Sequence, residues 1–406
     1  MINVIGLGYI GLPTALILSK NGLKVVGTDI SSEVVQKLNS GIITFEENGL
    51  QELFIDACKN KIVFSTEYIK TDIYIIAVPT PFLQLSKKLD SSYIIKAVHS
   101  VLDICEPGSI IVIESTISPG SIDRYVRPEV EKRNYIIGKD IHIVHAPERI
   151  IPGNMIYELE NNSRTIGADS IEIANKIKTV YSSFCKGEIV VTDIRSAEMS
   201  KVVENTYRDI NIAFANELAK ICRSDNMDVY EIIKIANKHP RVNILQPGPG
   251  VGGHCISVDP WFLVGDYPDL TNLILSARKV NDSMPNHVLK RISFIMKENN
   301  IRNVSDVGLY GLTYKENVDD TRESPTLQLL KQMEEHLSFG VKVYDPYIKS
   351  HLVENQYFDF NLFINDIKIL VIMVAHKQII ENINLLSEII IFDTKNIVQK
   401  KGVYKL

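Results

Sequence analysis

The amino-acid sequence predicts an α/β fold with two doubly wound parallel-sheet domains joined by a central helical domain. Three observations predict it. Short apolar runs alternate with helical patterns over the first part of the chain, a helical stretch without such runs follows, and the alternation returns after residue 300. We therefore expect domains at residues 1–190, 191–300 and 301–406.

The strands of the first domain are expected at residues 2–5, 24–28, 73–78, 110–114 and 141–145. Runs this short and this apolar are typical of parallel strands that are buried on both faces of a sheet. The helical patterns between them imply right-handed crossover connections, and these generate a doubly wound sheet.

The pattern changes near residue 195. Residues 195–223 contain no glycine or proline, which predicts one long helix with Asp193 or Ser196 as its N-cap. Further helical segments are expected at 229–238 and 273–298, separated by a stretch rich in proline and glycine. The strands of the last domain are expected at 306–310, 341–344, 369–374 and 389–392.

The composition is that of a soluble globular protein, with 45% hydrophobic and 23% charged residues and a net charge of −5. This charge gives no support to nucleic-acid binding or to a polybasic membrane anchor. The five cysteines are scattered without a C-x-x-C pair, so we expect neither a disulfide framework nor a metal site. Without a signal peptide or a membrane-spanning run, the protein is expected in the cytoplasm.

A dinucleotide-binding fingerprint opens the chain. Residues 6–11 read G-x-G-x-x-G after a predicted strand and before a predicted helix, and the next strand ends in Asp29. In a Rossmann-like domain the acidic residue accepts hydrogen bonds from the ribose hydroxyls, and it would repel a 2′-phosphate, so NAD is expected rather than NADP. The other interpretation is a glycine turn in an unrelated α/β protein. The expected cofactor-binding residues here are Gly6, Gly8, Tyr9, Ile10, Gly11 and Asp29.

Two further predicted strands of this domain end in polar clusters that contain Thr80 and Thr116. Ligands of open α/β sheets bind beyond the carboxyl ends of the strands, so both threonines are expected to line the nicotinamide side. Each could equally serve only as a turn or capping residue.

One cysteine stands out. Cys255 lies in the run PGPGVGGHCISVDP (residues 247–260), whose small residues leave a thiol accessible. A lone cysteine is more often an inert buried thiol. Beside a nicotinamide site, however, an accessible thiol predicts oxidation past the aldehyde by way of a covalent thioester.

Two polar groupings accompany this cysteine. Lys201, Asn205 and Arg208 fall on one face of the predicted long helix, although such a stripe often only faces solvent. In the last domain Lys315 and Arg322 follow a predicted strand, where cations suit phosphate groups, although a solvated charged loop is an equal alternative.

These residues resemble the UDP-glucose/GDP-mannose dehydrogenase family of NAD-dependent, four-electron nucleotide-sugar dehydrogenases across nearly the whole chain. The resemblance rests on residues 197–201 (AEMSK), 205–213 (NTYRDINIA) and 239–260. The run HPRVN (residues 239–243) is similar to members that act on N-acetylated sugars, which implies UDP-N-acetyl-D-mannosamine as the substrate.

The resemblance implies a catalytic set. The nucleophile is Cys255, and Lys201 and Asn205 hold the oxyanion. Asp259 orients the reacting groups around the thiol, Thr116 helps to place a water, and Glu148 serves thioester hydrolysis.

It also implies binding residues and a partner. The implied substrate contacts are Arg149, Ile150, Lys201, Asn205, Arg208, His239, Arg241, Gly252, Tyr314 and Lys315, and Thr116 and Arg322 complete the NAD contacts. Arg241 would come from a second subunit, because the resemblance implies at least a homodimer.

Three alternatives remain open. The first is a 6-dehydrogenase of UDP-glucose or UDP-N-acetylglucosamine, which would use the same catalytic set. The second is a two-electron hydroxyacid dehydrogenase of similar fold, for which Cys255 would be dispensable. The third is a non-catalytic, NAD-binding regulatory protein, against which the intact Lys201, Asn205, Cys255 and Asp259 argue.

Overall fold

The computed structural model describes residues 1–335, 340–386 and 388–406. Their contacts divide the chain into two compact units. Unit 1 comprises Met1–Glu204 and Trp261–Pro268, and unit 2 comprises Asn205–Pro260 and Asp269–Leu406. No helix in the described ranges is long and apolar enough to cross a membrane.

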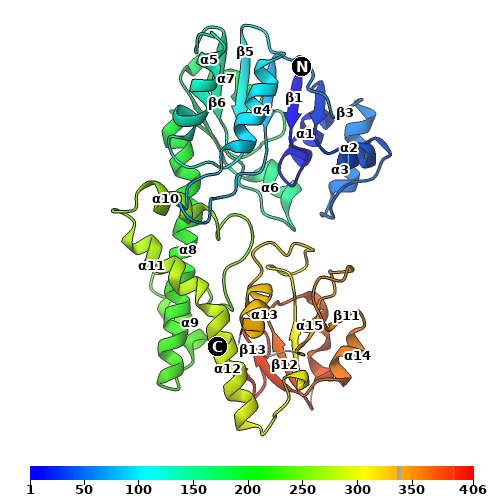
Figure 1. Cartoon of the computed structure of the whole chain (residues 1–406), viewed down its shortest axis with the longest axis vertical. Helices are drawn as coiled ribbons and strands as arrows, with labels where there is room; N and C mark the ends of the chain where they lie inside the picture. The colour runs from blue at the N-terminus through cyan, green and yellow to red at the C-terminus, as the bar shows by residue number, and fades with distance from the viewer. Residues whose placement is uncertain (336–339, 387) are drawn as a thin grey trace. The chain divides into compact units, whose positions relative to one another are not determined.

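An eight-stranded sheet lies at the centre of unit 1, in the order β3-β2-β1-β4-β5-β6-β7-β8 (Figure 1). The strands are β1 Ile2–Ile5, β2 Val25–Thr28, β3 Val63–Ser65, β4 Ile73–Ile76, β5 Ser109–Ile113, β6 Ile141–His145, β7 Arg164–Ala168 and β8 Ile189–Thr192. The helices are α1 Gly11–Lys20, α2 Ser32–Asn39, α3 Leu50–Lys59, α4 Ser92–Leu102, a π-helical turn Ile122–Val126, α5 Arg127–Lys132, α6 Met155–Asn161 and α7 Ile171–Tyr181.

The predicted doubly wound sheet of the first domain is confirmed. Neighbouring strands are parallel except for β6 and β7, which pair antiparallel. Strands β1, β4 and β5 are buried along their whole length, as their largely apolar sequences predict. Strands β3, β7 and β8 were not predicted, because their apolar runs are no longer than three residues.

The long central helix is α8, Ile194–Ser224. Asp193 is its N-cap, since Asp193 Oδ1 accepts a hydrogen bond from the Ser196 N–H at 2.9 Å. The remaining helices of this region are α9 Val229–Ala236, α10 Asp259–Asp266, α11 Asn272–Asp282 and α12 Met284–Glu298. The helical segment expected at 273–298 is therefore two helices. Pro285 lies in the first turn of α12, where its missing N–H costs nothing, and the chain breaks just before it.

Unit 2 contains a six-stranded sheet in the order β11-β10-β9-β12-β13-β14, with parallel pairing throughout (Figure 1). Its strands are β9 Val307–Tyr310, β10 Lys342–Tyr344, β11 Gln356–Tyr357, β12 Ile369–Ile372, β13 Ile390–Asp393 and β14 Tyr404–Lys405. Its helices are α13 Pro325–Glu335, α14 Phe360–Asn365 and α15 Lys377–Asn382, with 3-10 turns at Val304–Asp306 and Ile383–Leu385.

The second predicted α/β sheet is thus confirmed, and its strand order positions a functional loop. Strand β9 lies between β10 and β12, so the chain that leaves β9 at Gly311 is bordered by the ends of both neighbours. Fully buried side chains such as Leu309, Val371 and Leu329 hold this sheet to its helices. Each such side chain stabilises the fold by about 1.5–3 kcal/mol.

Candidate active site

The glycine fingerprint in unit 1 has the backbone geometry that a dinucleotide needs. Gly6 has a φ of +89°, and a Cβ on Gly11 would lie only 1.8 Å from the Gly6 carbonyl oxygen. Gly8 instead faces open space, with nothing within 4 Å of an added Cβ. Asp29 Oδ2 accepts the Leu7 N–H at 2.8 Å, which places the carboxylate beside this turn. These residues fit NAD, with its pyrophosphate at the start of α1.

Four of the other residues expected at the cofactor lie on the same unit, whereas Arg322 lies on unit 2. The Tyr9 ring lies tilted against the Phe45 ring, with 4.3 Å between the ring centroids, and Ile10 packs against the apolar core. Thr80 is buried and Thr116 is partly exposed, following β4 and β5 respectively.

Sequence analysis missed the residue that fixes the chain after Thr116. The buried Glu198 on α8 accepts hydrogen bonds from the backbone N–H groups of Gly120 and Ile122. The only sequence signal was its place in the AEMSK run, next to Lys201. Its carboxylate substitutes for the missing partners of two backbone donors at the start of the π-helical turn.

Glu148, the expected residue for thioester hydrolysis, belongs to a buried charge cluster. Arg164 on β7 forms an ion pair with Glu148 and approaches Glu114 at 3.6 Å. The Arg164 guanidinium also lies over the Tyr181 ring, 4.5 Å from its centroid. Glu148 Oε1 accepts the Arg149 N–H at 2.7 Å, so both oxygens of this carboxylate are held. Breaking such a buried pair by removing one partner typically costs about 3–5 kcal/mol.

Glu114 is the second carboxylate of this cluster. It shares the single guanidinium of Arg164 with Glu148. Its Oε1 accepts the Tyr181 hydroxyl at 3.0 Å, whereas its buried Oε2 has no hydrogen-bond partner among the described residues. Burial raises the pKa of Glu114 from 4.5 to about 7, although attraction to Arg164 opposes this shift. The carboxyl group therefore holds a proton at slightly acid pH.

Two residues expected to contact substrate are engaged by the protein. The guanidinium of Arg149 bonds the Ser163 carbonyl and the Thr165 hydroxyl, each at 2.9 Å, and the Glu204 carboxylate at 2.7 Å. The side chain of Ile150 is buried in the apolar core of unit 1, so only its backbone is available to a ligand.

The glycines around Cys255 serve close packing within unit 2. A Cβ on Gly252 would lie 2.6 Å from both Tyr314 Cβ and the Glu323 carbonyl oxygen. A Cβ on Gly253, whose φ is +82°, would lie 2.7 Å from Tyr314 Cε2. The Gly253 N–H also donates to the Arg322 carbonyl at 2.9 Å. We call residues 247–258 the cysteine loop; Tyr314 lies directly against it.

Cys255 itself is exposed, just before α10. Its carbonyl accepts the Asp259 N–H at 2.9 Å, and the Asp259 Oδ2 accepts the Asn205 amide at 2.6 Å. Lys201 and Asn205, one helical turn apart on α8, are both buried, whereas Arg208 is exposed. The expected polar stripe thus has a buried part and a solvent-facing part.

The cysteine loop has one further anchor that sequence analysis missed. The buried Arg278 on α11 forms an ion pair with Asp209 at 2.6 Å and reaches the Ile256 carbonyl at 3.5 Å. Asn281 donates to the same Asp209 carboxylate at 2.7 Å. A buried arginine can be identified only when its carboxylate partner is known, because the two lie 69 positions apart.

The remaining predicted residues of unit 2 are more exposed. Arg322 is held by Asp320, with Nε and Nη2 donating to the same carboxylate. His239 and Arg241 lie in the exposed turn after α9, where the Arg241 N–H donates to His239 Nδ1 at 3.3 Å. In the described ranges, no three His, Cys, Asp or Glu side chains gather in a way that could hold a metal ion.

Comparison with known protein families shows to which family the chain belongs. Residues 1–185 match the NAD binding domain of the UDP-glucose/GDP-mannose dehydrogenase family, residues 195–283 match its central domain, and residues 308–400 match its UDP binding domain. The chain belongs to this dehydrogenase family. The predicted NAD cofactor is thereby confirmed.

Individual relatives cover the whole chain. A UDP-N-acetyl-D-mannosamine dehydrogenase of Methanococcus vannielii is 43% identical over 99% of this chain and 95% of the relative. The solved UDP-N-acetyl-mannosamine dehydrogenase of Staphylococcus aureus is 41% identical, with a TM-score of 0.89 over 100% of this chain and 97% of that chain. An NDP-N-acetyl-D-galactosaminuronic acid dehydrogenase of Ralstonia nicotianae is 38% identical over 99% of this chain and 97% of the relative.

This dehydrogenase has a cavity of about 510 Å³ in unit 2 that sequence analysis did not identify. Its lining residues are Tyr230, Lys234, Asn237, Gln246, Lys395 and Asn396. The buried Tyr230 hydroxyl has no hydrogen-bond partner among the described residues. Burial lowers the pKa of Lys395. The available signal was the polar run after β13, residues 393–396, at the carboxyl end of a parallel strand.

The Glu114 carboxyl group predicts a pH-dependent stability. Because its folded-state pKa of about 7 lies above 4.5, its contribution is fully present below pH 4.5 and is lost as the pH rises through 7. The free energy of unfolding of the wild type should therefore fall across this window, with a slope of at most about 1.4 kcal/mol per pH unit from this group. Glu114→Gln, which cannot ionise, should lack this slope.

Urea denaturation at pH 5, 7 and 8.5 measures the difference. The free energy of unfolding of Glu114→Gln should rise relative to that of the wild type as the pH increases. For the control Glu131→Gln, at an exposed glutamate, the difference from the wild type should not change with pH. A constant difference between Glu114→Gln and the wild type across this range would show that Glu114 does not titrate there.

Proposed function

We propose that this protein oxidises UDP-N-acetyl-D-mannosamine at C6 to UDP-N-acetyl-D-mannosaminuronate, with two NAD molecules reduced per sugar. The observation that carries the proposal is the exposed Cys255 thiol on a loop held by Tyr314, in a chain whose family provides NAD- and UDP-binding domains. The choice of sugar is supported by the names of the Methanococcus and Staphylococcus relatives.

Cys255 is proposed to retain the sugar between two oxidations. When bound, NAD accepts a hydride from C6 in each of them. After the first, the thiol adds to the aldehyde and gives a thiohemiacetal. After the second, C6 is a thioester, which water cleaves to the carboxylate and the free thiol. Covalent attachment keeps the reactive aldehyde from escaping.

The remaining catalytic roles are proposed for four buried residues and for the partly exposed Thr116. Lys201 and Asn205 stabilise the negative charge that develops on the C6 oxygen, and loss of one such donor typically costs about 2.7–4 kcal/mol of barrier height. Asp259, which accepts the Asn205 amide at 2.6 Å, holds that amide in orientation. Thr116 places the hydrolytic water and Glu148 accepts its proton.

The substrate is proposed to bind chiefly through unit 2. Tyr314 and Lys315 follow the central strand β9, and the cationic cavity lined by Lys234 and Lys395 suits the nucleotide. Arg149, Arg208, His239 and the Gly252 backbone would complete the sugar contacts. Arg241, in its exposed turn, is proposed to reach the site of a partner subunit.

A different N-acetylated sugar is the second candidate. The Ralstonia relative, at 38% identity, is named for N-acetyl-D-galactosaminuronic acid. A panel of UDP-N-acetylmannosamine, UDP-N-acetylgalactosamine, UDP-N-acetylglucosamine and UDP-glucose, assayed for NADH, separates these options. The highest kcat/KM should belong to the mannosamine derivative, and a preference for any other sugar would replace it as the assigned substrate.

The covalent route predicts a stoichiometry. Wild-type enzyme should form two NADH per sugar consumed, whereas Cys255→Ala should form no uronate and still bind NAD, because the thiol has no role in binding the cofactor. Cys58→Ala, which removes another exposed cysteine, is the control and should retain full activity. One NADH per sugar, or uronate formation by Cys255→Ala, would contradict the assignment of the nucleophile.

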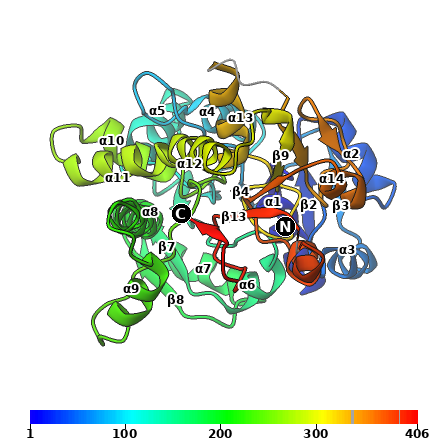
Figure 2. The ribbon, with the colours of Figure 1, turned by 90° about the horizontal axis from the view of Figure 1, so that it is seen from below.

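We further propose that α8 joins two copies of the chain. Three large apolar side chains recur at seven-residue intervals on α8, which places them on one helical face. Tyr207, Phe214 and Ile221 are 62%, 52% and 49% exposed in the single chain. Figure 2 views this helix nearly along its axis. A second copy that packs against this face would remove the three side chains from water.

Light scattering tests this dimer. The wild type should have twice the 45.8 kDa mass of one chain. Phe214→Asp should shift the population toward the monomer, because it places a charge in the contact. Ile171→Asp, at an apolar residue of α7 that is 67% exposed, is the matched control and should remain dimeric. A monomeric wild type would exclude the interface.

A further inference from the structure

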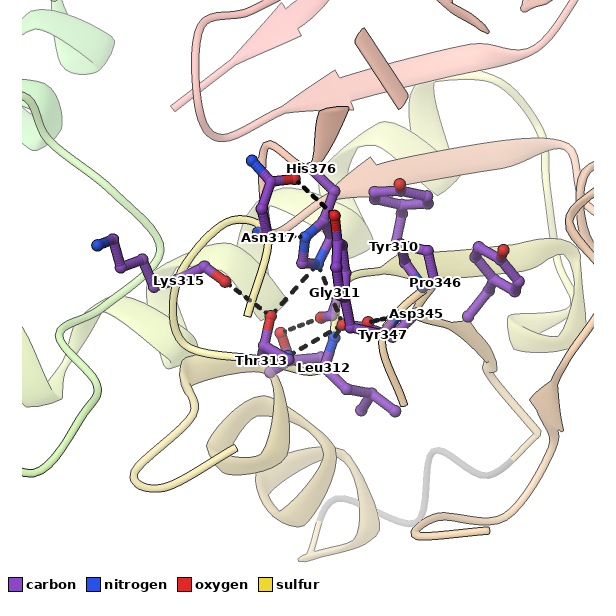
Figure 3. Close-up of polar contacts among 12 residues, drawn as sticks. Tyr310, Gly311, Leu312, Thr313, Lys315, Asn317, Asp345, Pro346, Tyr347 and His376 are labelled. Atoms are coloured by element: carbon purple, nitrogen blue, oxygen red, sulfur yellow. Dashed lines mark hydrogen bonds and ion pairs between the residues drawn. The ribbon is translucent and has the colours of Figure 1, made fainter. Parts of the chain in front are cut away.

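A buried cluster centred on a histidine lies in unit 2, and no role has been assigned to its side chains above. Asp345 follows the end of β10 and His376 follows the end of β12, and both side chains are fully buried. Because β9 lies between these strands, the two residues border the chain that leaves β9 on either side. We call residues 311–317 the Lys315 loop. Figure 3 shows that Asp345 and His376 both point into it.

Asp345 holds the beginning of the loop. Its Oδ2 accepts the N–H groups of Leu312 at 2.6 Å and Thr313 at 3.1 Å. Its Oδ1 accepts the Tyr347 N–H at 2.8 Å. Burial opposes ionisation of this carboxyl, but the bonds from His376 and these amides lower the pKa of Asp345. A carboxylate with several donors is the stable form here.

His376 links that carboxylate to the end of the loop. Its Nδ1 lies 2.9 Å from the Asn317 backbone nitrogen, whose N–H donates to it. Its Nε2 lies 3.2 Å from Asp345 Oδ2 and 3.3 Å from the Thr313 hydroxyl. That hydroxyl donates to the Lys315 carbonyl at 2.9 Å, so it can only accept from the ring. The partners therefore require a neutral imidazole with its hydrogen on Nε2.

The same loop touches the loop of the proposed nucleophile. Tyr314 lies in the chain between Thr313 and Asn317, which both bond to the cluster. Its side chain packs against Gly252 and Gly253, three and two residues before Cys255. Lys315 extends its ammonium group away from the cluster, as Figure 3 shows. The cluster thus holds the backbone, while the Lys315 side chain points away from it and the Tyr314 side chain packs against the cysteine loop.

We propose that His376 is a positioning residue, whose neutral ring clamps the Lys315 loop to the ends of β10 and β12 and thereby sets Tyr314 against the cysteine loop. The inference rests on the proposed function in one respect, namely that Tyr314 and Lys315 bind the UDP-sugar. The clamp acts by preorganisation, because it holds the loop in its binding conformation before the ligand arrives. When a loop is displaced part of the time, the apparent dissociation constant equals the intrinsic one divided by the fraction of molecules whose loop is in place.

Two substitutions of His376 distinguish the hydrogen bond that Nδ1 accepts from those that Nε2 donates. His376→Asn retains an acceptor near the position of Nδ1 and so keeps the Asn317 N–H paired. His376→Gln retains a donor near Nε2 but leaves that partly buried N–H without its acceptor. By isothermal titration calorimetry, His376→Gln should bind UDP about tenfold more weakly than the wild type, equivalent to about 1.4 kcal/mol, and His376→Asn should stay within about threefold.

Three comparisons exclude a general loss of structure. The affinity of each variant for NAD should be unchanged, since the fingerprint lies in unit 1. His287→Gln, at a half-buried histidine of unit 2 whose Nε2 has no partner among the described residues, should bind UDP like the wild type. In turnover, kcat should follow the same order as UDP affinity, because Tyr314 supports the cysteine loop.

A second pair of variants asks the same question without altering the histidine. Thr313→Val removes the hydroxyl that links His376 to the Lys315 carbonyl, and Thr313→Ser keeps it. The valine variant should lose UDP affinity severalfold and the serine variant should not. The clamp would be overturned if His376→Gln bound UDP as tightly as the wild type, or if His376→Asn and His376→Gln lost the same affinity. If the His376 variants do not fold, equal UDP affinities of Thr313→Val and Thr313→Ser would overturn it. UDP binding is read without turnover, so an inactive wild type would refute the proposed function and not this inference.

Discussion

A tight steric constraint in unit 2 is the contact between Tyr314 and the two glycines of the cysteine loop. No side chain larger than hydrogen fits at Gly252 or Gly253 while Tyr314 holds its place, since a Cβ at either position would lie 2.6–2.7 Å from Tyr314 atoms. The contact joins a loop at the carboxyl end of the sheet to the loop that carries Cys255. The position of the exposed Cys255 thiol thereby depends on secondary structure that lies more than 50 residues further along the chain.

Several buried polar groups maintain that contact. Asp345 and His376 hold the Lys315 loop from the ends of the two strands that flank β9, and Arg278 reaches the Ile256 carbonyl from α11. These three side chains are buried, so each would carry its desolvation penalty if it lost its partners. A similar logic applies in unit 1, where Arg164 serves two carboxylates and one of them, Glu114, has a raised pKa that lets it hold a proton.

Much of the fold could be predicted because it follows from local pattern. The apolar runs of β1, β4 and β5, the glycine-free α8 and the G-x-G-x-x-G turn each carry their own signal. Strand β7 could not be predicted, because its Arg164 is buried only through pairing with distant carboxylates. The break at Ser283 was missed because Pro285 is compatible with the first turn of a helix as well as with its interruption.

The site shows the same division. Cys255 was identified from its glycine-rich neighbours, although their packing against Tyr314 was not foreseen. The roles of Glu198, Arg278, Asp345 and His376 depend on partners between 22 and 78 positions away, which no spacing rule reveals. The cavity beside Lys395 likewise requires residues from α9 and from the end of β13 to meet.

The central claim is that Cys255 carries the sugar as a thioester. Acid quenching of the Glu148→Gln variant during turnover, followed by digestion and mass spectrometry, tests it most directly. Acid preserves thioesters, and the role proposed for Glu148 predicts that the substitution slows their hydrolysis. The account predicts that the peptide containing Cys255 gains the mass of the UDP-uronyl group in the presence of both NAD and UDP-N-acetyl-D-mannosamine. NADH formation without any adduct on Cys255, or an adduct on another residue, would contradict it.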